Sequence, residues 1–218
     1  GGAVVGACGQ VRVGRGVARA GWRLGAQDRW MKWGQGTHLL GAERRVFARK
    51  RLVVVVPATE RARCERLAQR SRRGIRLVLA ADAVPVGRYS REALRKLSAS
   101  TGYDADFGRR VLANVVSLEE NVKSVVTKVQ LGEADAGMVY RSDVTPAVSR
   151  YVIVLDIPEE SNVVASYPIA AVRNSAQREL AGGFIDLVLS AEGQSVLERH
   201  GFLPAEPKAG SPAPLKPR

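Results

Sequence analysis

Side chains for redox or nucleophilic chemistry are scarce in this sequence. It holds two cysteines and two histidines in 218 residues. Cys8 and Cys64 allow at most one disulfide and show no metal-ligand spacing. No Ser–His–Asp or Cys–His set can be assembled around His38 or His200, and His200 is expected at a helix end beside Gly201. The sequence therefore predicts neither an enzyme nor a protein that ligates a metal or cofactor directly.

Long hydrophobic runs are also missing. The longest purely aliphatic run, "LVVVV" at residues 52–56, is far too short to cross a bilayer. The apolar stretch around "VVGACG" at residues 4–9 is too short for a signal peptide, and no basic region precedes it. No signal peptide is therefore visible in this chain. The proline-rich tail, residues 205–218, is expected to be disordered.

Acidic residues are absent before Asp28, and serine is absent before Ser71. Residues 1–75 carry 17 Lys and Arg against 4 Asp and Glu, whereas residues 76–218 carry 17 of each. A nucleic-acid-binding arm would have this charge, but charge alone supplies only nonspecific affinity. Residues 1–29 are rich in glycine and arginine and show no helical or strand period. We expect them to be disordered, read out of frame, or divergent, and we expect no nucleic-acid partner.

From about residue 30 the chain alternates between strand and helix patterns. Strands are predicted at residues 51–57, 74–80, 134–140, 151–158 and 163–172. Helices are predicted at residues 63–71, 89–97 and 117–131, with two more within residues 177–202. In the third of these, Val122, Val125, Val126 and Val129 form one apolar stripe. This alternation predicts an α/β fold with mostly parallel sheets flanked by helices.

Potential anion donors occur where predicted strands give way to helices. The "VPVG" stretch is interpreted as a loop that brings Val86, Gly87 and Arg88 to the start of a helix. In this loop Pro85 fixes the backbone, and Gly87 lets it approach a ligand. Asn121 is a natural N-cap that would leave the Val122 N–H free. Backbone N–H groups at a helix start, aided by the helix dipole, bind anions.

One further pattern offers an alternative to these donors, and another adds to them. Ser117 and Glu120 could instead form a capping box one turn before Asn121. Tyr140 ends a predicted buried strand, immediately before the polar "RSD", where a hydroxyl would add a further donor. Each feature alone is more often plain architecture, and a buried tyrosine hydroxyl usually finds some partner. Together they favour an oxyanion held by neutral hydrogen-bond donors.

Several long stretches resemble the molybdate-binding periplasmic protein of ABC importers. They are "RRVFARKRLVVVVP", "AVPVGRYSREALRKL", "ENVKSVVTKVQLGEADAGMVYRSDV", "SYPIAAV" and "FIDLVLSAEGQSVLERHGFLP", and the resemblance covers about residues 30–204. It implies a two-lobed periplasmic-binding-protein type II fold, each lobe a mostly parallel sheet flanked by helices. The start of the first lobe is expected at residues 1–56, the second lobe at 57–163 and the return to the first lobe at 164–204.

The same resemblance implies a function. The protein would capture molybdate or tungstate in the cleft between the lobes and deliver it to a membrane permease with its ATPase. Carried over, the anion-binding residues are Val86, Val122 and Tyr140. The resemblance implies a monomer in the periplasm or cell envelope. The family's serine-bearing loops in the first lobe have no match here. A sulfate or phosphate receptor, or an oxyanion-sensing domain of a transcription regulator, stays open as an alternative.

Overall fold

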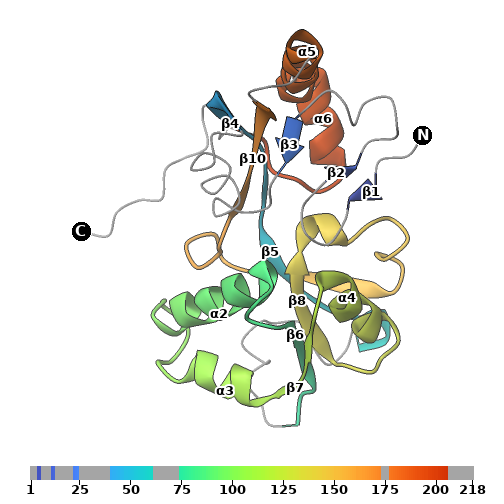
Figure 1. Ribbon diagram of the computed structural model, residues 1–218. Helices are drawn as coiled ribbons and strands as arrows, with labels where there is room; N and C mark the ends of the chain where they lie inside the picture. Colours follow the sequence, from blue (N-terminus) through green and yellow to red (C-terminus); the bar gives the residue numbers. More distant parts are fainter. Residues whose placement is uncertain are drawn as a thin grey trace. The chain divides into compact units, whose positions relative to one another are not determined.

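The chain divides into two compact units. The computed structural model describes residues 4–5, 11–12, 22–24, 40–60, 74–172 and 177–205 (Figure 1). Unit 1 comprises Gly1–Lys50 and Ala165–Arg218, and unit 2 comprises Arg51–Val164. The helix predicted at residues 63–71, both cysteines, His38 and most of residues 1–29 lie outside the described residues.

Each unit combines strands with helices. The described elements of unit 1 are β1 (Val4–Val5), β2 (Val11–Arg12), β3 (Trp22–Leu24), β4 (Leu40–Lys50), β10 (Ala165–Val172), α5 (Arg178–Leu189) and α6 (Ala191–Arg199). Those of unit 2 are β5 (Leu52–Pro57), η1 (Ala58–Glu60), β6 (Leu77–Ala80), α2 (Pro85–Ser98), α3 (Phe107–Ala113), β7 (Val115–Glu119), α4 (Val122–Gln130), β8 (Ala136–Tyr140), η3 (Arg141–Asp143) and β9 (Val152–Asp156).

The core of unit 2 is a five-stranded sheet in the order β7-β6-β8-β5-β9. Every residue of β5, β6 and β8 is buried, as predicted from their continuous apolar runs. The connections from β6 to β7 and from β7 to β8 run in opposite directions along the sheet. Because such crossovers are right-handed, α2 and α3 cover one face and α4 the other (Figure 1).

The strands are less parallel than predicted. Strand β6 is parallel to β7 and β8, but β5 pairs antiparallel with β8 and β9. Among the described strands of unit 1, β10 pairs antiparallel with both β3 and β4. The reason lies in the chain path: β4 leads the chain out of unit 1 and β10 brings it back, so the two run in opposite directions when they pair.

The helix predicted at residues 117–131 is two elements. Residues 115–119 form edge strand β7, and α4 begins only at Val122. The alternating burial of β7 is hidden in the sequence because its outward side chains, Val116 and Leu118, are themselves apolar and are 60% and 53% exposed. The remainder of the apolar stripe is confirmed, since α4 buries Val125, Val126 and Val129 against the sheet.

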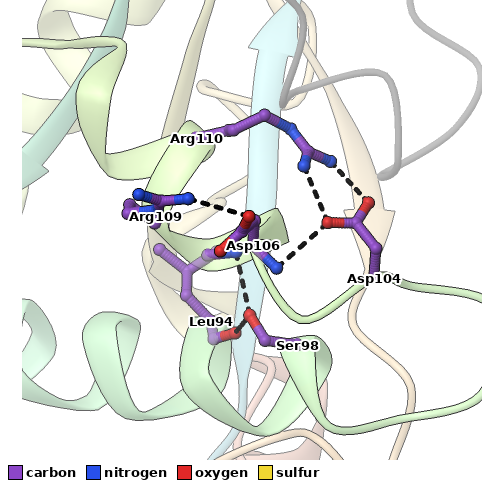
Figure 2. A network of polar contacts seen from close by, with 7 residues as sticks. Leu94, Ser98, Asp104, Asp106, Arg109 and Arg110 are labelled. Atoms are coloured by element: carbon purple, nitrogen blue, oxygen red, sulfur yellow. Dashed lines mark hydrogen bonds and ion pairs between the residues drawn. The ribbon is translucent and has the colours of Figure 1, made fainter.

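Figure 2 shows the polar contacts at the start of α3. The Arg110 guanidinium donates two hydrogen bonds to the Asp104 carboxylate, at 2.7 and 2.6 Å. The first of these oxygens also accepts from the Asp106 N–H at 3.0 Å. The Ser98 hydroxyl of α2 accepts from the Gly108 N–H at 2.9 Å, so one side chain joins the two helices. The Arg110 contact also lowers the pKa of Asp104.

Unit 1 contains an aromatic cluster beside the paired strands β4 and β10. The Tyr167 ring packs edge-to-face against Phe47 and Phe202, each with its centroid 6.4 Å away. The Lys50 Nζ lies 5.0 Å from the Tyr167 centroid and 4.9 Å from that of Phe202, which is cation–π range. Helix α6 ends at the C-cap His200, and the helix end predicted there is confirmed.

Candidate anion-binding site

Three adjacent parallel strands of unit 2 end at the same sheet edge. Strand β6 lies between β7 and β8 and is parallel to both, so α2, α4 and η3 all begin at their carboxyl ends. The Ala81 N–H donates to the Glu119 carbonyl at 2.8 Å, which ties the turn after β6 to the end of β7. Helices α2 and α4 leave this edge toward opposite faces, the arrangement at which open α/β sheets bind ligands.

The first turn of α2 exposes a backbone donor at this edge. Pro85 occupies the first helical turn, where its missing N–H costs nothing, so residues 85–87 are helical rather than the predicted loop. The N–H groups of Gly87 and Arg88 both donate to the Val84 carbonyl, at 3.0 and 3.3 Å. No side chain caps the helix, and no hydrogen bond within the described residues uses the Val86 N–H.

Gly87 serves the packing of α2 on β6. A Cβ at this position would lie 2.2 Å from the Ala81 carbonyl oxygen and 2.4 Å from that of Ala80. These are backbone atoms at the end of β6, which cannot rotate away. Glycine is therefore needed there so that the helix start can sit on the strand end, and its role in the approach of a ligand stays a prediction.

Arg91 holds the same turn in place, although the sequence patterns did not single it out. Its Nη1 donates to the carbonyls of Gly87 at 3.0 Å and Ala80 at 3.3 Å, and its Nε lies 2.9 Å from the Asp82 carboxylate. One guanidinium thus links the last residue of β6, the following turn and the first turn of α2. A planar group with several fixed donors suits this task, which a point-charge lysine could not perform equally well.

The start of α4 has the predicted N-cap. The Asn121 Oδ1 accepts from the Ser124 N–H at 2.9 Å, and the residue is extended as an N-cap requires. The N–H of Val122, the first helical residue, donates no hydrogen bond within the described part of the chain. The alternative capping box is wrong, because Ser117 belongs to β7 and its hydroxyl donates to Glu119 instead.

The charge of a carboxylate beside the start of α4 is balanced by a neighbouring lysine. The Glu119 Oε1 lies 2.6 Å from the Lys128 Nζ, and the Ser117 hydroxyl donates to the same oxygen. The hydrogen bond from Lys128 and then that from Ser117 hold the pKa of Glu119 below its ordinary value, against the effect of burial. Only 13% of the Glu119 side chain is exposed. The pairing limits the repulsion that this carboxylate would exert on an anion at the sheet edge.

This pairing makes stability depend on pH. A carboxyl group with a lowered folded pKa stabilises the protein above its unfolded pKa, and that contribution is lost as the pH falls through the folded value. We expect the free energy of unfolding to fall between about pH 5 and pH 3 by more in the wild type than in Glu119→Gln. Urea unfolding across this range measures it. Glu120→Gln, at the exposed neighbouring residue, serves as a control for the loss of one carboxylate from this segment. Equal profiles for the wild type and Glu119→Gln would contradict the assignment.

Tyr140 ends β8 and is 5% exposed. Its N–H donates to the Asp143 carboxylate at 3.0 Å, and the Arg141 N–H donates to the Arg51 carbonyl at 3.0 Å. The polar "RSD" after the buried strand is therefore a short 3-10 turn, capped by its own aspartate. The turn fixes the end of β8, and with it the position of Tyr140, at the edge where α2 and α4 begin.

The three predicted residues thus lie on elements that share one sheet edge of unit 2. Val86 and Val122 are each the source of an uncapped N–H, and Tyr140 brings a buried hydroxyl. Within the described ranges, no group of three His, Cys, Asp or Glu side chains could hold a metal ion. None of the described helices is long and apolar enough to span a bilayer. Ser142, in η3, was not found from the sequence, because nothing in its pattern distinguishes it from a surface serine.

Two α/β units, one of which gathers helix starts at the carboxyl ends of its parallel strands, have the architecture of the two-lobed periplasmic-binding-protein fold. The chain belongs to the family of bacterial extracellular solute-binding proteins, whose model matches residues 22–203. Membership confirms the prediction of a binding protein rather than an enzyme. The match begins ahead of the expected residue 30, and β3, at Trp22–Leu24, is already paired with β10.

Known proteins support the fold. The molybdate-binding protein ModA of Mycobacterium tuberculosis is 33% identical over 156 residues, which cover 72% of this chain and 55% of that protein. The chain therefore spans about half the length of this relative. A substrate-binding domain from Clostridium difficile superposes with a TM-score of 0.72 at 23% identity, covering 87% of this chain and 79% of that one. The periplasmic molybdate-binding protein of Azotobacter vinelandii superposes with a TM-score of 0.64 at 14% sequence identity. The match covers 84% of this chain and 78% of that one. The predicted fold class is confirmed.

Proposed function

We propose that this protein is the molybdate-binding component of an ABC importer. The observation that carries the proposal is the set of neutral donors at one edge of unit 2: the uncapped Val86 and Val122 N–H groups and the Tyr140 hydroxyl. The identity shared with the Mycobacterium tuberculosis ModA supports molybdate as the anion. Tungstate offers the same charge and tetrahedral shape, so we propose it as an equivalent ligand.

Neutral donors suit a fully ionised anion. Backbone N–H and hydroxyl groups at helix starts stabilise negative charge through hydrogen bonds and the helix dipole without a counter-ion. A hydrogen phosphate would bring a proton that needs an acceptor. The largely buried carboxylate beside the start of α4, Glu119, is already engaged by Lys128 and Ser117. The donor set therefore favours molybdate, tungstate or sulfate over phosphate.

Membership of an importer implies partners and a location. We propose that the loaded protein delivers its anion to a membrane permease that is powered by an ATPase, and that it works as a monomer in the periplasm or cell envelope. The family's description as extracellular supports this location. Size-exclusion chromatography with light scattering tests the oligomeric state, and a stable dimer would contradict the monomer.

The ligand is tested by thermal unfolding and isothermal titration calorimetry with molybdate, tungstate, sulfate and phosphate in turn. A ligand that binds only the folded state stabilises it by about 2.7 kcal/mol at a free concentration of 100 Kd. We expect molybdate and tungstate to raise the melting temperature, and phosphate to have little effect. A rise in melting temperature with sulfate alone would identify sulfate, and not molybdate, as the ligand. The absence of any shift or heat with all four anions would refute the proposal.

A further inference from the structure

The hydroxyl of Ser142 is buried and unused. Its Oγ is shielded from solvent and takes no hydrogen bond within the described residues. Most buried polar side-chain atoms in proteins have a partner, so an exception among the described residues calls for an explanation. Removing a hydroxyl from water without giving it a partner costs free energy.

The backbone around Ser142 is held firmly. On one side, the Arg141 N–H donates to the Arg51 carbonyl at 3.0 Å. On the other, the Asp143 carboxylate accepts from the Tyr140 N–H at 3.0 Å. The Val144 N–H closes the turn on the Arg141 carbonyl at 3.2 Å. The hydroxyl is therefore carried by a fixed turn.

The turn stands at the candidate site. Ser142 lies two residues after Tyr140, and η3 contacts α4, the helix that begins with Val122. Both elements begin at the carboxyl ends of the parallel strands β6, β7 and β8. A serine hydroxyl is a neutral donor of the same kind as the other groups gathered at this edge. The Ser142 hydroxyl lacks an acceptor within the described residues, and an oxyanion at this edge would supply one.

We propose that the Ser142 hydroxyl donates a hydrogen bond to the oxyanion bound at this edge. The inference rests on the proposed function and deepens it by adding a fourth donor to Val86, Val122 and Tyr140. It also explains why a buried hydroxyl is retained where the described part of the chain offers no acceptor. In the free protein the hydroxyl carries a cost, and the bound anion removes it.

The test is the Ser142→Ala variant, measured both free and with molybdate. Removing one donor to a charged acceptor should raise the Kd by about 10-fold or more. The melting temperature of the free protein should stay the same or rise, because the variant no longer buries an unpaired hydroxyl. Weaker binding together with undiminished stability is the result expected for a side chain that contacts the ligand and does not support the fold.

Ser98 offers a matched control in the same unit. Its Oγ donates to the Leu94 carbonyl at 3.1 Å and accepts from the Gly108 N–H at 2.9 Å, as drawn in Figure 2. A Ser98→Ala variant should therefore show the opposite signature, with a lower melting temperature and an unchanged Kd. The two variants together separate a ligand-binding serine from a structural one.

Each outcome decides the matter. If the wild type binds molybdate and Ser142→Ala binds it equally well, the inference is overturned and the proposed function stands. If Ser142→Ala lowers the melting temperature of the free protein as Ser98→Ala does, with an unchanged Kd, the hydroxyl is structural and the inference is again overturned. If the wild type binds none of molybdate, tungstate and sulfate, the proposed function fails and the inference fails with it. Weaker binding without loss of stability supports both.

Discussion

A Tyr140→Phe variant is expected to bind molybdate with a Kd about 10- to 150-fold higher than the wild type. The change keeps the aromatic ring and removes one hydroxyl donor to a charged acceptor, a loss of about 1.5–3 kcal/mol. The ring remains in its buried place at the end of β8, where the variant has lost no packing. Isothermal titration calorimetry, or competition with a weaker anion where binding is tight, measures the change.

Tyr103→Phe provides the control for this variant. Tyr103 also belongs to unit 2, where its ring packs against Phe107 with centroids 4.7 Å apart. It lies between α2 and α3, away from the edge at which η3 begins. Its replacement should leave the Kd unchanged. If Tyr140→Phe also binds like the wild type but melts at a lower temperature, the Tyr140 hydroxyl is part of the architecture and is no anion ligand.

A Gly87→Ala variant is expected to lose about 3 kcal/mol of stability and to bind molybdate at least about 100-fold more weakly. The added methyl group would meet two backbone carbonyl oxygens, so the start of α2 must move away from β6. The Val86 N–H belongs to the residue immediately before Gly87, in the same turn, and would move with it. Urea unfolding and calorimetry at a temperature where the variant is folded measure the two effects.

Glycines of unit 1 separate these two effects. A Cβ at Gly193, at the start of α6, would lie 2.2 Å from the Leu187 carbonyl oxygen, a clash equal to that at Gly87. Gly193→Ala should therefore destabilise the protein without removing any donor of unit 2. Gly182, inside α5, has open space around it, and alanine there should stabilise the helix by about 0.5–1 kcal/mol. Equal losses of affinity in Gly87→Ala and Gly193→Ala would show that binding merely follows stability.

Burial and caps could be predicted from the sequence because each depends on a few neighbouring residues. The run "LVVVV" is buried in β5, and Asn121 caps α4 as its position before an apolar stripe indicates. Strand β7 could not be predicted because its exposed positions are apolar. The alternation of apolar and polar residues that marks a half-buried strand is therefore absent from the sequence. Its place at the edge of the sheet is a tertiary fact that local periodicity does not contain.

The candidate site shows the same division. Val86, Val122 and Tyr140 could be named because helix starts and strand ends leave local signals. Arg91 could not, because its role comes from carbonyl groups that the fold brings around it. Ser142 is a further such case, since the burial of a single hydroxyl depends on packing from several elements.

The division of the chain into a continuous and a discontinuous unit has a consequence for biosynthesis. Unit 2 is the single stretch Arg51–Val164, so all of its sheet is synthesised before the rest of unit 1. Strand β4, by contrast, pairs with β10, whose first residue is Ala165, and must wait for it. At about 5–20 residues per second, the delay between Lys50 and Ala165 is on the order of ten seconds. The chain of unit 2 is therefore complete while β4 still lacks its native partner.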